Sequence, residues 1–349
     1  MKARPRGEAG WIRYIRKVWG PSGAPLDLGD DAAVLPAAPY AVTTDALLEG
    51  VDFERPWGPP EALGHKALAV NLSDLAAVGA RPRFCLLTLA LPEDMKDRWV
   101  EGLLRGMRRL ALREGVGLCG GDLSRSRSGL VVSLTAFGVL EGPPLTRTGG
   151  RPGDLLFVSG PLGAPRAALK AFLAGVSLRT FGEDPPRHPR LALLDRFFRP
   201  PSQTETGLLL SREGLASAAL DISDGFARDL HRLLAASRCG AEVEARALPV
   251  DPLSGSGEEA LREALLGGEE QVLLFAVPER EAARVARLLP GAAWVGRLRK
   301  GRGCDLLWPG GVREPLLPAG FDHFRPGEPS PPSARRTAPP PVLPPGGRR

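Results

Sequence analysis

The residues of this chain that could do chemistry are aspartates, gathered in short segments beside glycine and hydroxyl residues. Cysteine and histidine offer no comparable cluster, because the four residues of each type are scattered and no CxxC pair occurs. The segments are LGDDAAVL (Asp30, Asp31), TTDALLEGVDF (Thr43, Thr44, Asp45, Asp52), LAVNLSDLAAVGA (Asp74), GGDLSRS (Gly121, Asp122) and LDISDGF (Asp221, Ser223, Asp224). Most are expected at strand ends or turns. Carboxylate and hydroxyl oxygens without soft ligands suit magnesium, and magnesium in turn suggests phosphoryl transfer.

Some of these aspartates also have a structural interpretation. Asp74 lies inside an Ala/Leu-rich helical stretch, where an unpaired carboxylate is costly, although solvent near the helix end could satisfy it. Asp224 could cap the N-terminus of a helix over FARDLHRLLAAS, with Gly240 as its terminator. Asp221 and Ser223 escape that interpretation, since in an extended segment they project from one face.

The elements that must position these residues predict an α/β or α+β chain with two domains. Apolar runs typical of strands (YAVTTDAL, FCLLTLAL, GLVVSLTAFGVL) alternate with helical stretches in residues 1–150, and the turn-rich GGRPGD at 149–154 fits a boundary. Residues 151–324 again mix strands and helices, which predicts a second α/β domain. Residues 325–349 contain nine prolines and few large apolar side chains, so we expect a disordered tail.

Composition argues against membrane and nucleic-acid partners. No run of 18 apolar residues occurs and the N-terminus lacks a signal-peptide core, so we expect a cytoplasmic protein. The formal charge of +6 comes from the ends, because residues 1–17 carry +5 and residues 325–349 carry +4. The body between them is slightly acidic and predicts no basic face for nucleic acid.

Familiar nucleotide-binding motifs are absent or misplaced. Residues 115–120, GVGLCG, match GxGxxG, but a helical stretch precedes them and a strand follows, the reverse of a dinucleotide-binding unit. Neither GxxxxGK[ST] nor the HRD and DFG motifs of protein kinases occur. If the chain binds a nucleotide, it does so in another way.

In order along residues 8–324, the motifs GDDAAVL, TDALLEGVDF, KALAVNLSDLAAVGARP, GGD, LTRTGGRPGD, LDISDGFARDL, GGEE and GFDHF resemble the thiamine-monophosphate kinase family. That family belongs to the ATP-binding superfamily that also contains aminoimidazole ribonucleotide synthetase. The resemblance implies direct transfer of the γ-phosphoryl of ATP to thiamine phosphate, giving thiamine diphosphate and ADP. It also implies a homodimer whose N-terminal sheets join into a barrel, with the nucleotide in a groove near that interface.

Carried over by motif, the resemblance implies three groups of site residues. Several Mg²⁺ ions would be held by Asp31, Thr43, Thr44, Asp45, Asp74, Asp122, Asp221 and Asp224. ATP would contact Gly121, Asp122, Arg147 and Ser223, with a surface position in the turn LTRTGG as the alternative for Arg147. Asp52, Glu269 and Phe321 would face the thiamine moiety.

Two departures from the family pattern bear on the substrate. Asp52 stands where the family usually has a histidine that contacts substrate, and GGEEQVLL replaces the usual GGEDYEL, which keeps Glu269 but loses the aromatic residue. Two alternatives therefore remain open. One is another ATP-dependent enzyme of the superfamily, such as an aminoimidazole ribonucleotide synthetase-like ligase, and the other is a non-catalytic nucleotide- or metal-binding protein.

Overall fold

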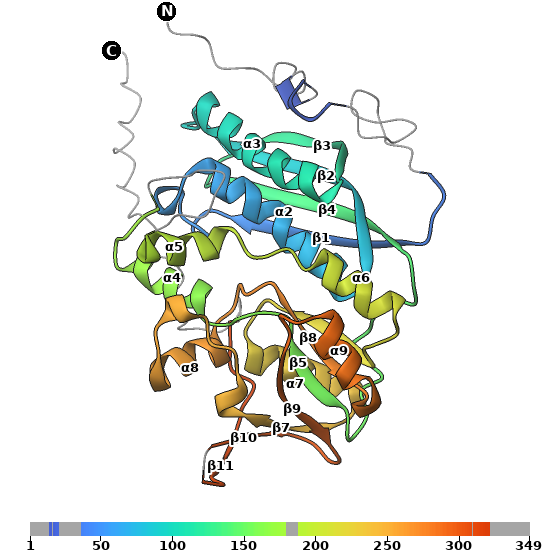
Figure 1. Cartoon of the computed structure of the whole chain (residues 1–349). Helices are drawn as coiled ribbons and strands as arrows, with labels where there is room; N and C mark the ends of the chain where they lie inside the picture. Colours follow the sequence, from blue (N-terminus) through green and yellow to red (C-terminus); the bar gives the residue numbers. More distant parts are fainter. Residues whose placement is uncertain (1–13, 16, 21–35, 179–187, 309, 322–349) are drawn as a thin grey trace, which may run out of the picture.

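The chain is a two-domain α/β protein, with a four-stranded sheet in its N-terminal half and a seven-stranded sheet in its C-terminal half (Figure 1). The computed structural model describes residues 14, 15, 17–20, 36–178, 188–308 and 310–321. Asp30, Asp31 and the tail predicted over 325–349 lie outside the described residues, so the structure leaves those predictions untested. Within the described parts of the chain, no helix has the length and apolar character needed to cross a bilayer.

The N-terminal sheet is mixed, and α2 (Pro60–Ala77) and α3 (Asp97–Glu114) cover one of its faces in the described part of the chain. Its strand order is β1 (Tyr40–Leu48), β4 (Val131–Leu140), β2 (Ala80–Pro92) and β3 (Gly117–Ser126), and only β2 and β3 run parallel. Along β4, buried Val132, Leu134 and Ala136 alternate with partly exposed neighbours, as a strand with one covered face requires. The buried set packs under α2 and α3.

Helix α2 is the central element of the molecule, because it is apolar on nearly all sides. A helix that is hydrophobic all round is stable only when it is surrounded, and α2 contacts α3, β1 and β4 in its own domain and α6, β6 and β8 of the other (Figure 1). The extent of α2 agrees with the helix predicted from the sequence PEALGHKALAVNLSDLAAVGA. The helix therefore carries Asp74 to the border between the domains.

The C-terminal sheet is almost entirely antiparallel. Its order is β11 (Arg313–Pro315), β10 (Cys304–Leu307), β7 (Gly240–Glu244), β9 (Ala293–Arg299), β5 (Leu155–Val158), β8 (Val272–Val277) and β6 (Ala218–Ile222), with β7 and β10 as the parallel pair. Helices α7 (Phe226–Ser237) and α8 (Gly257–Leu266) pack in the core on one face. Helices α6 (Thr204–Arg212) and α9 (Ala282–Leu288) pack in the core on the other. Helices α4 (Ala164–Leu173) and α5 (Pro189–Phe198) join the N-terminal core instead.

The structure locates the predicted domain boundary and the glycine-rich segment that precedes Asp122. Residues 149–154, the predicted boundary, lie in the connection between β4 and β5. Asp122 lies within β3, whereas most of the aspartate segments were expected at strand ends or turns. The glycines of GVGLCG lead into that same strand and no helix leaves them, which agrees with rejecting a dinucleotide fingerprint.

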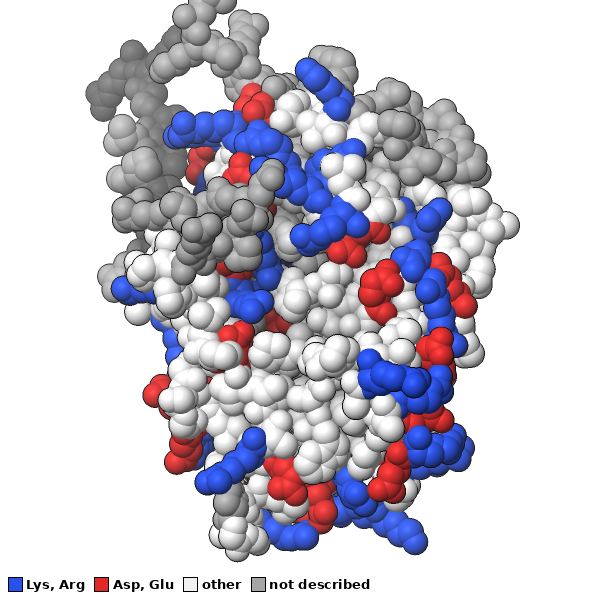
Figure 2. Space-filling model, viewed as in Figure 1, with Lys and Arg blue, Asp and Glu red and all other residues white. Residues whose placement is uncertain are grey.

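Charged side chains of both signs are interspersed on the face shown in Figure 2, with basic ones more frequent over the upper, N-terminal domain. On α3, Arg105 pairs with Glu61 at 2.9 Å and Arg113 with Glu114 at 3.5 Å. The basic side chains of this helix are thus partly neutralised by their neighbours.

Candidate active site

A cavity of about 410 Å³ lies between the two domains. Its walls come from β1 and the turn after it, from α2, α4 and α5, from β6 and the loop after it, from the loop before β8, and from the segment after β11. The lining residues are Asp45, Ala46, Leu47, Val51, Asp52, Val70, Asp74, Pro165, Arg166, Leu169, Lys170, Leu173, Phe197, Asp221, Ser223, Asp224, Gly268, Glu269, Gln271 and Phe321. Most of the site residues predicted from the sequence are therefore brought together, from segments far apart in the chain.

Helix α2 connects the carboxylates of three segments. The Thr43 hydroxyl on β1 donates to Asp74 Oδ2 at 2.5 Å, and the Ser73 hydroxyl donates to Asp221 Oδ2 on β6 at 2.9 Å. Burial raises the pKa of Asp74, while the hydrogen bond from Thr43 and the guanidinium of Arg147 offset part of that rise. Asp74 is thus held in the cavity wall rather than merely solvated at a helix end.

The carboxylates stand close enough to one another to disfavour their charged forms. Desolvation by the surrounding protein raises the pKa of Asp45 to about 7, even though this residue is open to the cavity, and the charges of Asp74, Glu269, Asp52 and Asp224 add to the rise. Like charges gathered in a cavity raise carboxyl pKa values in this way. Bound cations would relieve this repulsion.

Asp221 shows the same effect in a fully enclosed position. Only 5% of this residue is exposed, and burial raises its pKa to about 7, with a further contribution from Asp74. The hydrogen bond from Ser73 opposes the rise. Among the described residues, no group of three or more His, Cys, Asp or Glu side chains is already arranged as a metal site. Any bound cation would therefore need ligands from water, from substrate phosphates or from Asp31, which lies outside the described residues.

Asp229 builds the loop that presents Ser223 and Asp224, and sequence reasoning missed it. Its Oδ2 atom accepts the backbone N–H groups of Ser223, Asp224 and Gly225 at 3.1, 3.0 and 3.1 Å. Arg232 joins the two aspartates, since its Nη1 donates to Asp229 Oδ1 at 2.6 Å and its Nη2 to Asp224 Oδ2 at 2.5 Å. The signal available in the sequence was an aspartate one turn into the helix after ISDG.

The same loop corrects the capping interpretation of Asp224. The N-cap position of α7 is Gly225, and Asp224 makes an ion pair with Arg232 instead. The helix ends at Ser237, and the residue that terminates it is Arg238, with a left-handed φ of 56°, and not Gly240. Asp224 therefore lines the cavity with its charge already paired.

The loop before β8 places Glu269 in the cavity through unusual backbone geometry. Glu269 and Gln271 have φ angles of 70° and 53°, in the left-handed region that non-glycine residues seldom occupy. Two hydrogen bonds fix this loop, from Glu269 N–H to the Ser223 carbonyl at 2.7 Å and from Gln271 N–H to the Ile222 carbonyl at 2.9 Å. Such strain often accompanies function.

Asp52 and Phe321, which the resemblance predicts to face the thiamine moiety, also line the cavity. Asp52 Oδ2 accepts the Leu48 N–H at 2.7 Å and so closes the turn after β1. Phe321 is anchored through its backbone, because its N–H donates to the Asp224 carbonyl at 2.9 Å and its carbonyl accepts from Arg228 Nη1 at 2.5 Å. Both residues face the site from fixed positions.

Thr44, Gly121, Asp122 and Arg147 do not line the cavity. Successive side chains of a strand point to opposite faces, so Thr44, next to Thr43 and Asp45, faces the side of the sheet away from α2 and α3. Its hydroxyl donates to the Leu134 carbonyl at 3.0 Å. Arg147 still acts on the site, since its charge lowers the pKa of Asp74.

Gly121 and Asp122 lie on β3, at the opposite edge of the sheet from Asp45. Three strand spacings separate those edges, or about 14 Å. Asp122 pairs with Thr88, whose neighbour Leu87 faces the helices, so the Asp122 side chain faces the open side of the sheet. A Cβ atom on Gly121 would lie 1.9 Å from the Leu87 carbonyl oxygen, so the packing of β3 against β2 requires a glycine at this position.

The wall contributed by α4 was also missed from the sequence. Arg166, Leu169, Lys170 and Leu173 recur at helical spacing and line the cavity. The two cations both pair with Glu263 of α8, Arg166 through Nε at 2.9 Å and Lys170 through Nζ. Nothing in the local sequence distinguishes this helix from an ordinary surface helix.

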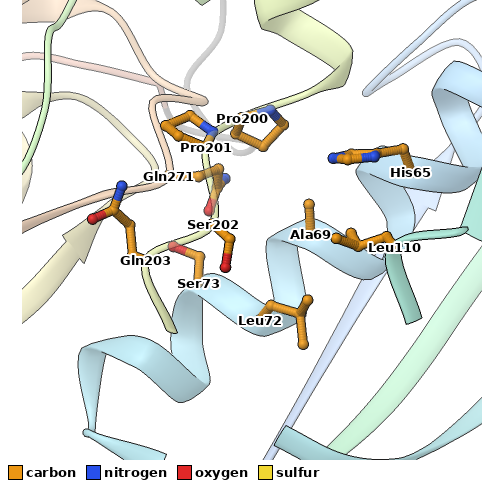
Figure 3. A pocket seen from close by; sticks show the side chains of 10 residues that line it. All are labelled: His65, Ala69, Leu72, Ser73, Leu110, Pro200, Pro201, Ser202, Gln203 and Gln271. Carbon is orange, nitrogen blue, oxygen red and sulfur yellow. The ribbon is translucent and has the colours of Figure 1, made fainter. Parts of the chain in front are cut away.

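A second cavity of only about 10 Å³ lies beside the first, near Ser73 and Gln271 (Figure 3). His65 faces it, and burial lowers the pKa of this histidine to about 3, with Arg113 and Arg199 adding to the effect. Since a cavity of this size has room for about one water molecule, it is too small for a substrate.

The fold and the site define the class of protein to which the chain is similar. Residues 29–140 match the family model described as "AIR synthase related protein, N-terminal domain", and residues 151–308 match the corresponding C-terminal domain. The chain is 35% identical over 319 residues to thiamine-monophosphate kinase of Rhodopirellula baltica, which covers 85% of this chain and 91% of that protein. It is 38% identical over 260 residues to the Escherichia coli K12 enzyme, covering 73% and 77% of the two chains.

Comparison with solved structures points to the same family. Thiamine-monophosphate kinase from Stenotrophomonas maltophilia superposes with a TM-score of 0.75 at 35% identity, covering 85% of this chain and 94% of that one. A structure described as AaThiL complexed with AMPPCP and TMP gives a TM-score of 0.69 at 31% identity, covering 90% and 100%. The chain belongs to the thiamine-monophosphate kinase family, which confirms the resemblance seen in its motifs. Hydrogenase maturation protein HypE in complex with ATP, with a TM-score of 0.71 but 20% identity, shares the fold alone.

Proposed function

We propose that this chain transfers the γ-phosphoryl group of ATP directly to thiamine monophosphate, giving thiamine diphosphate and ADP. The observation that carries the proposal is the cavity between the domains, where Asp45, Asp74, Asp221 and Asp224 converge from three separate motif segments. Family membership supplies the substrates, since relatives that share most of this chain's length are thiamine-monophosphate kinases.

Magnesium is the cofactor that these residues fit. Asp45 and Asp221 have pKa values raised to about 7 by burial and by neighbouring carboxylates, so a divalent cation would be attracted to them. We propose that Asp45, Asp74 and Asp221 hold Mg²⁺, with Thr43 supporting Asp74. Asp31, Thr44, Asp122 and Asp224 remain predicted ligands that rest on the resemblance.

The chain's residues then need only bind and orient two anions. The second pKa of a phosphate monoester is near 6, so the attacking oxygen of thiamine monophosphate is largely ionised at neutral pH and no general base is required. Bound magnesium would neutralise charge between the reactants. Asp52, Glu269 and Phe321 would hold the thiamine moiety, while Ser223, Arg147 and Gly121 would contact the nucleotide.

We further propose that the enzyme is a cytoplasmic homodimer. The open face of the N-terminal sheet exposes Val42 by 57% and Leu48 by 40%, which is apolar surface that a second copy could cover. Thr44 and Asp122 share that face. Because the cavity lies on the other side of the sheet, Thr44 and Asp122 could act together with its carboxylates only if a bound nucleotide or a second copy of the chain reached both. Closure of two such sheets into a barrel is the predicted form of the dimer.

The direct test is incubation with ATP, Mg²⁺ and thiamine monophosphate, followed by chromatographic detection of thiamine diphosphate and ADP. We expect equal amounts of both products, and none in excess EDTA. ADP without thiamine diphosphate would instead indicate an ATP-dependent enzyme with another acceptor. Binding of ATP without turnover would indicate a non-catalytic protein. Full activity of Asp74→Asn or Asp221→Asn would remove that residue from the proposed metal ligands.

A further inference from the structure

Helix α2 presents a stripe of residues along the cavity. Val70 and Asp74 line the cavity, and Lys66 lies one further turn toward the start of the helix. Residues four apart share a face of a helix, so the three follow one line. At 1.5 Å per residue, Lys66 and Asp74 are separated by about 12 Å along that line. Asp74 lies at the end of this line beside Asp221, and Lys66 lies at the other end of the line, beside Glu269.

Lys66 is an almost fully buried charged side chain beside the cavity. It is 1% exposed, although lysine is seldom buried without a partner. Its Nζ lies 3.1 Å from Glu269 Oε1, donates to the Phe197 carbonyl at 3.2 Å, and lies 3.4 Å from the centroid of the Phe197 ring. Burial of an ammonium group is costly unless such partners compensate it. The cost of burying this charge indicates that Lys66 has a role beyond packing.

Glu269 is the partner that connects Lys66 to the cavity. The Glu269 side chain is 31% exposed, whereas that of Lys66 is 1% exposed, so the glutamate is the member of the pair that a ligand can reach. The backbone at Glu269 has a φ of 70°, a conformation that surrounding contacts must stabilise. The ion pair to a fully buried lysine on a rigid helix is one such contact.

Resting on the function proposed above, we propose that Lys66 is a positioning residue for the phosphate acceptor. It holds the Glu269 carboxylate in the cavity, where Glu269 accepts hydrogen bonds from the amino-substituted, cationic heteroaromatic part of the acceptor. The acceptor then lies along α2, with its ring system beside Glu269 and its phosphate toward Asp74. Lys66 determines affinity for the acceptor and not for ATP.

The test compares Lys66→Met, Glu269→Gln and the double variant in steady-state kinetics. We expect each single variant to raise KM for thiamine monophosphate about tenfold or more, because a charge-assisted contact is lost. KM for ATP should stay within about twofold of wild type. Since the two residues act as one unit, the double variant should be little worse than either single variant. Lys300→Met, at an exposed position, serves as the matched control.

Three outcomes would overturn the inference: additive effects in the double variant, equal increases in both KM values, or an unchanged acceptor KM in Lys66→Met. If Lys66→Met does not fold, as judged by its thermal unfolding, Glu269→Gln alone decides through the same split between the two KM values. A wild-type chain that neither binds thiamine monophosphate in calorimetry nor phosphorylates it would instead refute the proposed function. That result is distinct from failure of the Lys66 assignment.

Discussion

Thr43 Oγ1 donates a 2.5 Å hydrogen bond to Asp74 Oδ2, joining the edge strand β1 to helix α2. This bond connects two motif segments that lie 31 residues apart in the chain. It opposes the effect of burial on the Asp74 carboxylate, since it favours the charged form and lowers the pKa. Thr43 therefore supports the carboxylate that a metal ion would need in its ionised state.

Replacement of Thr43 by valine, which has nearly the same shape, should weaken magnesium binding. Loss of the hydroxyl raises the pKa of Asp74 and leaves its Oδ2 without that donor, so we expect about a tenfold higher Mg²⁺ concentration for half-maximal activity. Thr44→Val is the matched comparison, because the Thr44 hydroxyl donates to the Leu134 carbonyl and not to a carboxylate. If Thr44→Val weakens magnesium binding more than Thr43→Val does, Thr44 would be a metal ligand as the resemblance predicts, although in a single chain its hydroxyl lies away from the cavity.

The raised pKa of Asp221, about 7, predicts opposite pH dependences for stability and for magnesium binding. Between about pH 4 and pH 7 the folded protein holds a proton on this carboxyl that the unfolded chain has released. This contribution to the free energy of unfolding therefore falls as pH rises through that window. Magnesium competes with the same proton, so its affinity should rise over the same range.

Calorimetric titration of magnesium into the metal-free protein at pH 6.5, in buffers of different ionisation enthalpy, measures the protons released. We expect net proton release in the wild type and less release in Asp221→Asn. Thermal unfolding without metal should show a weaker loss of stability between pH 5 and pH 7 in that variant. Equal proton release by both proteins would contradict the assignment of the raised pKa to Asp221.

The sequence was sufficient where the local pattern itself determines the structure. The apolar stretch around Asp74 predicted a buried helix, and the spacing of Asp221 and Ser223 predicted a shared face; both residues line the cavity. Lys66 and Asp229 could not be assigned, because their roles depend on partners brought in by tertiary packing. The orientation of Asp122 likewise required the register of β3 on β2, which a single sequence does not contain.

Asp52→His tests how this chain recognises its acceptor without the family's histidine. Asp52 lines the cavity, so an imidazole there should keep or improve affinity for thiamine monophosphate. The same change removes the acceptor for the Leu48 N–H, which should lower the free energy of unfolding by about 1 kcal/mol. Asp52→Asn, which retains an oxygen acceptor, is the control. A large loss of affinity in Asp52→His would mean that this chain recognises its acceptor by a different arrangement.

Asp229→Asn should destabilise the loop that carries Ser223 and Asp224. Asp229 is fully buried and accepts hydrogen bonds from the backbone N–H groups of both residues. An amide cannot balance the charge of Arg232, so we expect a loss of about 2–3 kcal/mol in the free energy of unfolding. Activity at saturating substrate should also fall, since Asp224 would lose its fixed position. Asp94→Asn breaks an exposed ion pair with Arg55 and should change stability by less than about 0.5 kcal/mol. Urea unfolding of both variants beside wild type measures the difference, and equal midpoints would show that Asp229 does not stabilise the loop.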